Sequence, residues 1–210
     1  MPTAVKTLRS DARRNRERLV ASARELFAAR GLEVSVEEIT QHARVGMGTL
    51  YRHFPTKDDL VDAVLQDAFA EIARLAEEAA ATEDAWEGLT GFLHDALELH
   101  VQNRGVKDLL AAREHGHDAA RARIRRLLRS VVERAQEQGT LRRDFVFEDL
   151  PPVFWSTARI VQATADVAPG YWRRYLSFLL DGLRASAATR AAAPPLTRGQ
   201  LQRAHGRHGR

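Results

Sequence analysis

The chain contains no cysteine, so disulfide bridges, thiolate zinc sites, thiol nucleophiles and cysteine redox switches are excluded. With only 13 glycines and 7 prolines in 210 residues, collagen-like and wholly disordered classes are excluded as well. No apolar run approaches the roughly 18 residues of a bilayer-spanning helix, and residues 1–10 lack the hydrophobic block of a signal peptide. We therefore expect a soluble, cytoplasmic protein with no membrane partner.

Aromatic residues are also scarce, at 7%, while apolar residues make up 44% of the chain. This composition favours helices, and the length suffices for one large or two small domains with a real core. The net charge of +4 is sorted along the chain: residues 1–57 carry a net +5, residues 58–181 a net −7 and residues 182–210 a net +6. Basic ends around an acidic middle suggest that an end meets a polyanion. Charge alone leaves open a chance clustering with a basic tail.

Helix signals follow one another closely at the start of the chain. An apolar stripe predicts a helix over residues 11–30, and Gly31 stands where a glycine ends a helix. Residues 35–38 have the S-x-x-E form of a capping box and predict a second short helix. A third is expected over residues 49–53, before Pro55, and a second capping box at residues 56–59 opens a long helix.

The remainder also has helical periodicity and no strand pattern, which predicts an all-α fold. The further helices are expected over residues 86–101, 106–113, 124–135, 148–166 and 169–183. Beyond residue 190 the apolar content is too low to order the chain. We expect residues 1–57 to form an N-terminal arm and a three-helix module, residues 58–189 to form a larger helical domain, and residues 190–210 to be a disordered basic tail.

The two short helices, joined by a turn near residues 43–46, have the layout of a helix-turn-helix, whose second helix fits the major groove of DNA. Residues 48–60 read Gly-Thr-Leu-Tyr-Arg-His-Phe-Pro-Thr-Lys-Asp-Asp-Leu. With the segment from residue 35 onward, they resemble the DNA-binding module of the TetR family of bacterial transcriptional repressors. The resemblance implies a binding protein that is not an enzyme, with no cofactor, and with a larger helical region for ligand binding and dimerisation.

The motif supplies candidate DNA contacts. Thr49, Tyr51 and His53 carry polar tips and Lys57 a cation, which suit phosphate contacts. The resemblance places Met47, Gly48 and Arg52 opposite base edges. The Arg52 guanidinium can bond a guanine twice, Met47 can pack on a thymine methyl, and Gly48 permits close approach.

Several of these residues have a second interpretation. Tyr51 and His53 also suit the completion of a small core. Arg44 stands where the family usually has glycine, so the turn is strained there, differs slightly, or gains a phosphate contact. The first helix is preceded or opened by a set of arginines that either reaches DNA or is a solvated flank: Arg9, Arg13, Arg14, Arg16 and Arg18.

The resemblance also implies a mostly apolar inducer cavity in the region after Thr56. We expect its lining among aromatic and apolar residues of the larger domain, for which plain core packing is the alternative: Phe69, Trp86, Leu89, Phe92, Leu93, Leu97, His100, Trp155 and Arg159. The last two helices are expected to form a homodimer that binds a near-palindromic operator. The expected interface residues are Trp155, Ala158, Val161, Ala165, Tyr171, Tyr175, Phe178, Leu179 and Leu183.

Other functions fit these residues less well. A TetR-like activator or dual regulator is the nearest alternative to a repressor. Adjacent carboxylates suit caps and solvated faces better than acid–base pairs, and the glycines at 46 and 48 lack the third glycine of a dinucleotide fingerprint. A metal site at His115 and His117 lacks a clear carboxylate partner. A basic membrane-binding helix over residues 121–129 shares its helix with a normal core stripe.

Overall fold

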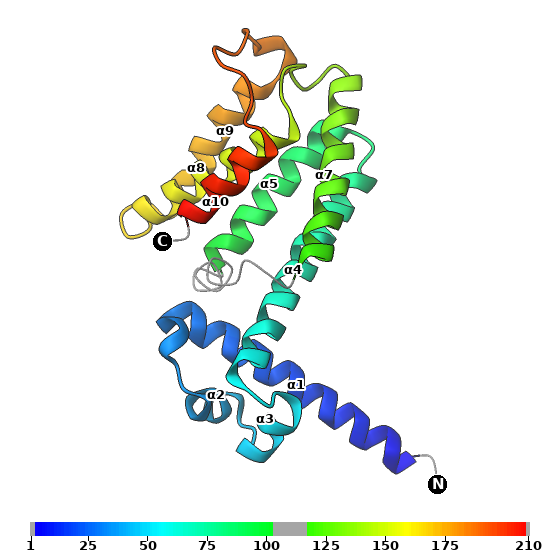
Figure 1. Ribbon diagram of the computed structural model, residues 1–210, viewed down its shortest axis with the longest axis vertical. Helices are drawn as coiled ribbons and strands as arrows, with labels where there is room; N and C mark the ends of the chain where they lie inside the picture. Colours follow the sequence, from blue (N-terminus) through cyan, green and yellow to red (C-terminus); the bar gives the residue numbers. More distant parts are fainter. Residues whose placement is uncertain (1–2, 103–116, 209–210) are drawn as a thin grey trace. The chain divides into compact units, whose positions relative to one another are not determined.

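The computed structural model describes residues 3–102 and 117–208, and helices dominate these ranges without any β-strand (Figure 1). The helices are α1 (Thr3–Arg30), α2 (Val36–Ala43), α3 (Met47–His53), α4 (Lys57–Ala81), α5 (Ala85–Gln102), α7 (Asp118–Glu137), α8 (Leu150–Thr164), α9 (Tyr171–Leu183) and α10 (Arg198–His208). Short 3-10 turns lie at Gly31–Glu33, Phe147–Asp149 and Ala185–Ala187. The all-α prediction is confirmed, and the helix predicted over residues 106–113 lies outside the described residues.

The described chain forms two compact units, residues 3–68 and residues 69–102 with 117–208. The predicted boundary at residue 57 is therefore moved into α4. The reason is packing, because Leu60, Val61, Val64 and Leu65 of α4 are buried in the core of the first unit. None of the described helices is both long and apolar enough to cross a bilayer.

Local signals determine the helix limits of the first unit. Gly31 adopts a φ of +72°, a left-handed conformation that ends α1 at low cost. The predicted capping box is present at the start of α2: the Glu38 N–H donates to the Ser35 hydroxyl (3.2 Å), and the Ser35 N–H donates to the Glu38 carboxylate (2.9 Å). The Thr56 N–H likewise donates to the Asp59 carboxylate (2.9 Å) and opens α4. Helices α1, α2 and α3 then contact one another around Phe27, Ile39 and Leu50.

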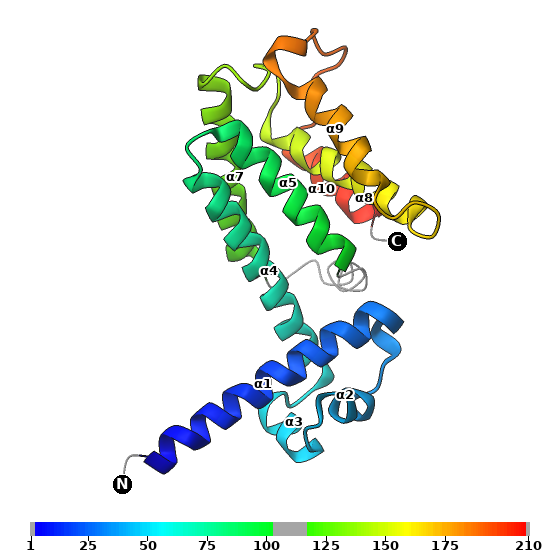
Figure 2. The same ribbon diagram turned by 180° about the vertical axis from the view of Figure 1, so that it is seen from behind.

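The second unit is a layered bundle in which α5 packs against α7 and α8, and α8 packs against α9 (Figure 2). Its core gathers the buried faces of these helices and of the second half of α4. Trp172 is 1% exposed and anchors α9 in this core. Gly139, with a φ of +71°, ends α7 as its position in the sequence predicts.

The end of the chain differs from the prediction of a disordered tail. The Arg142 N–H donates to the Leu183 carbonyl (3.0 Å), and the Ala185 N–H donates to the Thr140 carbonyl (2.9 Å). Further on, residues 190–196 line a groove beside the start of α8, and α10 follows. The sequence argument missed this order because a hydrogen bond from the Ala191 N–H to the distant Asp144 carboxylate (3.2 Å) holds a segment that has few apolar residues.

Candidate functional site

The turn between α2 and α3 contains a strained residue. Arg44 has φ 53° and ψ 47°, the left-handed conformation that a glycine would adopt at lower cost, and its side chain is exposed. For a non-glycine residue this conformation costs about 1–2 kcal/mol. The Arg44 N–H donates to the Gln41 carbonyl (3.1 Å), and the Val45 N–H donates to the Thr40 carbonyl (3.0 Å). Of the alternatives open for Arg44, the geometry supports a strained turn.

Helix α3 presents a polar face to solvent. Its apolar member Leu50 is fully buried, whereas Gly48, Tyr51 and Arg52 are exposed. Tyr51 is 48% exposed, so it does not complete the small core. A Cβ added at Gly48 would meet no atom within 4 Å, so packing inside the protein does not require glycine there. This face is open to a ligand that approaches the helix closely.

Other members of the predicted DNA surface are only half-exposed. The Met47 sulfur lies 3.3 Å from the Thr40 hydroxyl of α2, so this side chain packs partly on its own module. Thr49 and His53 are half-buried, and the His53 ring lies 6.3 Å from the Phe54 ring. Lys57 donates to the Leu32 carbonyl, so its ammonium is attached to the loop after α1. An ammonium has three N–H donors, and two remain for a phosphate.

The arginines at the start of α1 are engaged within the module rather than forming a free arm. Arg13 pairs with Glu17 (3.5 Å) and Arg14 pairs with Asp11. The Arg16 guanidinium lies 5.4 Å from the centre of the Phe54 ring, and Arg18 donates to main-chain carbonyls of the turn. Nothing is described for the side chain of Arg9. Sequence reasoning missed the last two contacts because they join residues far apart in the chain.

Most of the predicted ligand-pocket lining is packed core in this structure. Five of its members belong to the buried cluster of the second unit: Trp86, Leu89, Phe92, Leu93 and Leu97. Phe69 is also buried, with the His117 ring 4.9 Å away and the Arg121 guanidinium 5.2 Å away. The alternative of plain core packing therefore describes these residues in this structure.

The remaining predicted lining residues lie nearer the surface. The half-buried His100 ring meets the Phe154 ring edge-on at 5.6 Å, and Trp155 is half-buried. Arg159 is exposed and donates to the Gln162 side chain (3.3 Å). The prediction that Arg159 lines an internal cavity is therefore corrected, because its guanidinium reaches solvent along α8.

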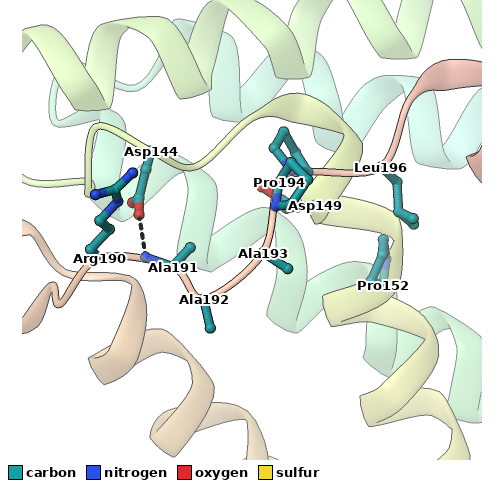
Figure 3. Close-up of a pocket in the computed structure, with 10 residues that line it drawn as sticks. Asp144, Asp149, Pro152, Arg190, Ala191, Ala192, Ala193, Pro194 and Leu196 are labelled. Atoms are coloured by element: carbon teal, nitrogen blue, oxygen red, sulfur yellow. Dashed lines mark hydrogen bonds between the residues drawn. The ribbon is translucent and has the colours of Figure 1, made fainter.

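An open groove of about 900 Å³ lies elsewhere, between residues 190–196 and the start of α8 (Figure 3). Its two carboxylates are already occupied. Asp144 accepts two bonds from Arg142 (2.6 and 2.9 Å) and one from the Ala191 N–H (3.2 Å), while Asp149 accepts from the Val146 N–H (2.9 Å). The Arg142 guanidinium holds the pKa of Asp144 well below its usual range. The bond from Ala191 fastens the C-terminal segment to the loop after α7.

The predicted dimer residues divide into an outer and an inner set. Tyr171 and Phe178 are 44% and 55% exposed, and Tyr175 between them is half-buried. Trp155, Ala165, Leu179 and Leu183 are also half-buried. Ala158 and Val161, in contrast, are 7% and 1% exposed within the core of their own protomer. These two are removed from the predicted interface, because the α8–α9 packing already covers them.

No cluster of three or more histidine, aspartate or glutamate residues suited to a metal ion occurs in the described ranges. His117 is described at the start of α7, but His115 lies outside the described residues, so the weak metal-site alternative gains no support. An exposed polar helix held by a short turn on a three-helix core, in a chain that also forms a separate helical bundle, defines the class of helix-turn-helix regulators.

Comparisons with known proteins agree with that class. Residues 19–64 match the family of bacterial regulatory proteins of the tetR family, and residues 84–185 match the C-terminal domain of SbtR-like transcriptional regulators. An HTH-type transcriptional regulator of Staphylococcus aureus is 45% identical over 60 residues, which span 28% of this chain and 32% of that protein.

Solved structures extend the likeness over most of the chain. A TetR transcription regulatory protein from Mycobacterium vanbaalenii is 33% identical with a TM-score of 0.64, over 84% of this chain and 99% of that one. A TetR transcriptional regulator from Streptomyces coelicolor is 26% identical with a TM-score of 0.63, over 80% and 98%. The chain belongs to the TetR family of transcriptional regulators. It is a DNA-binding transcription factor and not an enzyme.

Proposed function

We propose that this protein is a ligand-responsive repressor that binds a near-palindromic operator as a homodimer and is released by a small, mostly apolar inducer. The observation that carries the DNA-binding part is the exposed face of α3, where Gly48, Tyr51 and Arg52 are exposed above the buried Leu50. One such module is too small for tight specific binding, and a two-fold dimer doubles its contacts.

The contacts divide by chemistry. Arg52 is exposed and forms no ion pair within the described residues, so its two-pronged guanidinium is available to the O6 and N7 atoms of a guanine. Gly48 and Met47 lie on the same helix and would meet neighbouring base edges. Phosphate contacts fix the register of the protein on DNA without reading its sequence. The residues that would make them are Thr49, Tyr51, His53, Lys57 and the strained Arg44.

Self-association is assigned to the outer face of α9. Tyr171, Tyr175 and Phe178 follow one another at the i, i+4 and i+7 spacing of one helix face, and exposed apolar surface of this kind marks an association site. Gly182 continues the same face, and a Cβ there would meet no atom within 4 Å of its own protomer. A partner helix can therefore approach closely.

The inducer would act by opening the second unit. Its predicted lining is packed together in this structure, so a ligand that enters between α5 and α8 near His100 must separate side chains that now touch. Such a ligand binds the opened form better than the packed form. Successive major grooves are roughly 34–36 Å apart. If the opened form holds the two recognition helices at another separation, ligand binding weakens DNA binding, and DNA binding weakens ligand binding by the same factor.

In vitro selection from a random duplex library, followed by fluorescence anisotropy over a salt series, tests the DNA part. A two-fold symmetric selected site and a steep fall of affinity with salt are expected. Arg52→Ala should relax the base preference at one position per half-site, by about 1–3 kcal/mol. Arg143→Ala, the matched loss of an exposed arginine from the second unit, should leave the preference unchanged. An unchanged selected site in Arg52→Ala would refute the assignment of the reader.

Thermal-shift screening tests the inducer. A compound that stabilises the protein should also lower its affinity for the selected duplex, because the two bindings are linked. Stabilising compounds that leave DNA affinity intact would show that the second unit does not control the first. Light scattering that gives a monomer at the concentrations used for DNA binding would contradict the dimer.

A further inference from the structure

Helix α1 contacts the turn before the recognition helix α3 and the residue that caps its end, through two arginines that sequence reasoning assigned to DNA or to solvent. At the turn before α3, the Arg18 guanidinium donates to the main-chain carbonyls of Ala43 and Arg44, the second at 3.3 Å. At the far end, the Arg16 guanidinium stacks on the ring of Phe54, the residue that caps α3. Arg16 and Arg18 are two residues apart on one helix.

The carbonyls that Arg18 binds have a physical need for a partner. The last carbonyls of a helix lack intrahelical donors and carry the negative end of the helix dipole. Ala43 is the last residue of α2, and Arg44, directly after it, is in the left-handed conformation. One nitrogen of the guanidinium, Nη2, donates to both neighbouring carbonyl oxygens and compensates their partial charge. The direction in which the chain leaves α2, and hence where α3 begins, depends on this pair of peptide groups.

We propose that Arg18 is a positioning residue for DNA recognition, which fixes the α2–α3 turn and so sets the angle at which α3 presents Gly48 and Arg52. This inference rests on the proposed function, in which α3 reads base edges. Because base contacts depend on orientation more steeply than phosphate contacts do, losing Arg18 should cost sequence preference rather than nonspecific affinity.

The positioning role of Arg18 has a simpler alternative, a direct phosphate contact, because the Arg18 side chain is exposed. The two roles differ in the salt dependence of binding. A lost phosphate contact reduces the slope of log K against log salt by about 0.9, whereas a lost positioning contact leaves the slope unchanged. They also differ in what lysine can replace, since lysine keeps the charge but its ammonium is one bond nearer to the backbone than the Nη2 atom that binds both carbonyls.

The experiment compares full-length Arg18→Gln, Arg18→Lys and wild type by anisotropy, on the duplex that wild type selects and on a random-sequence duplex of equal length. Both variants should lose about tenfold of the preference for the selected duplex, the scale of a hydrogen bond to a charged group, with an unchanged salt slope. Arg13→Gln removes the same charge from the same helix at a residue paired only with Glu17 in the described chain. This control should keep the preference.

Hydrogen exchange gives a readout inside the module. The amides of Arg44 and Val45 are bonded across the turn, and their exchange should accelerate in both Arg18 variants while the fold is retained. Wild-type behaviour of Arg18→Lys in preference and exchange would overturn the positioning role, and so would a reduced salt slope with intact preference. If wild type itself selects no duplex, the proposed function fails and this inference fails with it. If wild type selects a duplex and the variants match it, only this inference fails.

Discussion

The two units of the molecule differ in what they expose. The first unit buries most of its apolar residues around Phe27 and Leu50, and α3 leaves Arg52 and the hydroxyl-bearing Tyr51 in solvent. The second unit, with a larger core, leaves Tyr171 and Phe178 exposed on α9. A surface of hydrogen-bond donors suits a polyanion, whereas an aromatic face suits a protein partner. The residues left outside each core therefore indicate the partner better than the net charge does.

The largest expected effect is on the free energy of unfolding, and it should differ between the inner and outer faces of α9. Trp172→Ala removes a side chain that is 1% exposed, and should lower the free energy of unfolding by about 3–5 kcal/mol. Tyr171→Ala, at the neighbouring exposed position, should change the folding of the protomer by less than about 0.5 kcal/mol. Thermal and urea unfolding followed by circular dichroism measure both. Equal losses would show that the two faces are not distinct.

A smaller effect is expected on association. Phe178→Ala removes an exposed ring on which Arg174 stacks at 4.9 Å, and should weaken dimerisation about tenfold or more without lowering protomer stability. Analytical ultracentrifugation over a concentration series measures the change. Val167→Ala is the control, because Val167 is even more exposed but precedes α9. If both substitutions weaken the dimer alike, the outer face of α9 is not the interface.

Two glycines give a matched comparison between the units. A Cβ at Gly48 of α3 or at Gly91 of α5 would meet no atom within 4 Å, so alanine should stabilise either helix by about 0.5–1 kcal/mol. Gly48→Ala should nevertheless weaken binding to the selected duplex about tenfold, the scale of one base-edge contact. Gly91→Ala should leave DNA affinity unchanged. Melting temperature and anisotropy, measured on the same samples, separate the two effects.

The smallest expected effect is the loss of stability of the first unit in acid. The Ser35 N–H, and after it the Arg30 guanidinium, hold the pKa of Glu38 below its ordinary value. A lowered pKa in the folded state contributes stability above the ordinary value of about 4.3, and this contribution is lost as pH falls through the lowered pKa. Glu38→Gln should therefore be less stable than wild type at neutral pH, and the difference should shrink below about pH 4. Denaturant titrations at several pH values measure it, with exposed Glu37→Gln as control.

Most helix ends of the first unit could be predicted because their signals are local, although α1 begins at Thr3 and not at residue 11. Ser35 with Glu38, Thr56 with Asp59, and Gly31 each define a helix end within three residues of sequence. The bonds from Arg18 to the turn could not be predicted, because they span 25 and 26 residues and any exposed arginine offers the same chemistry. Likewise, the apolar stripe that includes Leu60 and Val64 would look the same whether the start of α4 packed in the first unit or in the second, so the sequence could not locate the boundary between the units.

The helices of the second unit could be predicted from the sequence, but the roles of their residues in a ligand cavity or a dimer interface could not. Trp86 and Leu93 have the helical spacing of a core stripe, and a cavity lining has that spacing too. Only the packing of the folded chain distinguishes a core stripe from a cavity lining. In the same way, Ala158 and Val161 are as apolar as an interface requires, and their burial under α9 follows from tertiary packing. The order of residues 190–196 depends on Asp144, nearly fifty residues earlier in the chain.

Arg142 has a consequence for proteolysis. Its guanidinium donates to Asp144, to the Gly182 carbonyl (3.2 Å) and to the Thr189 carbonyl, so the loop after α7 holds the chain on both sides of residue 184. Trypsin cleavage after Arg190 would leave these bonds in place, whereas cleavage after Arg184 would release Thr189 and every residue beyond it. A protease should therefore trim the end of this chain in two stages, fast and then slow.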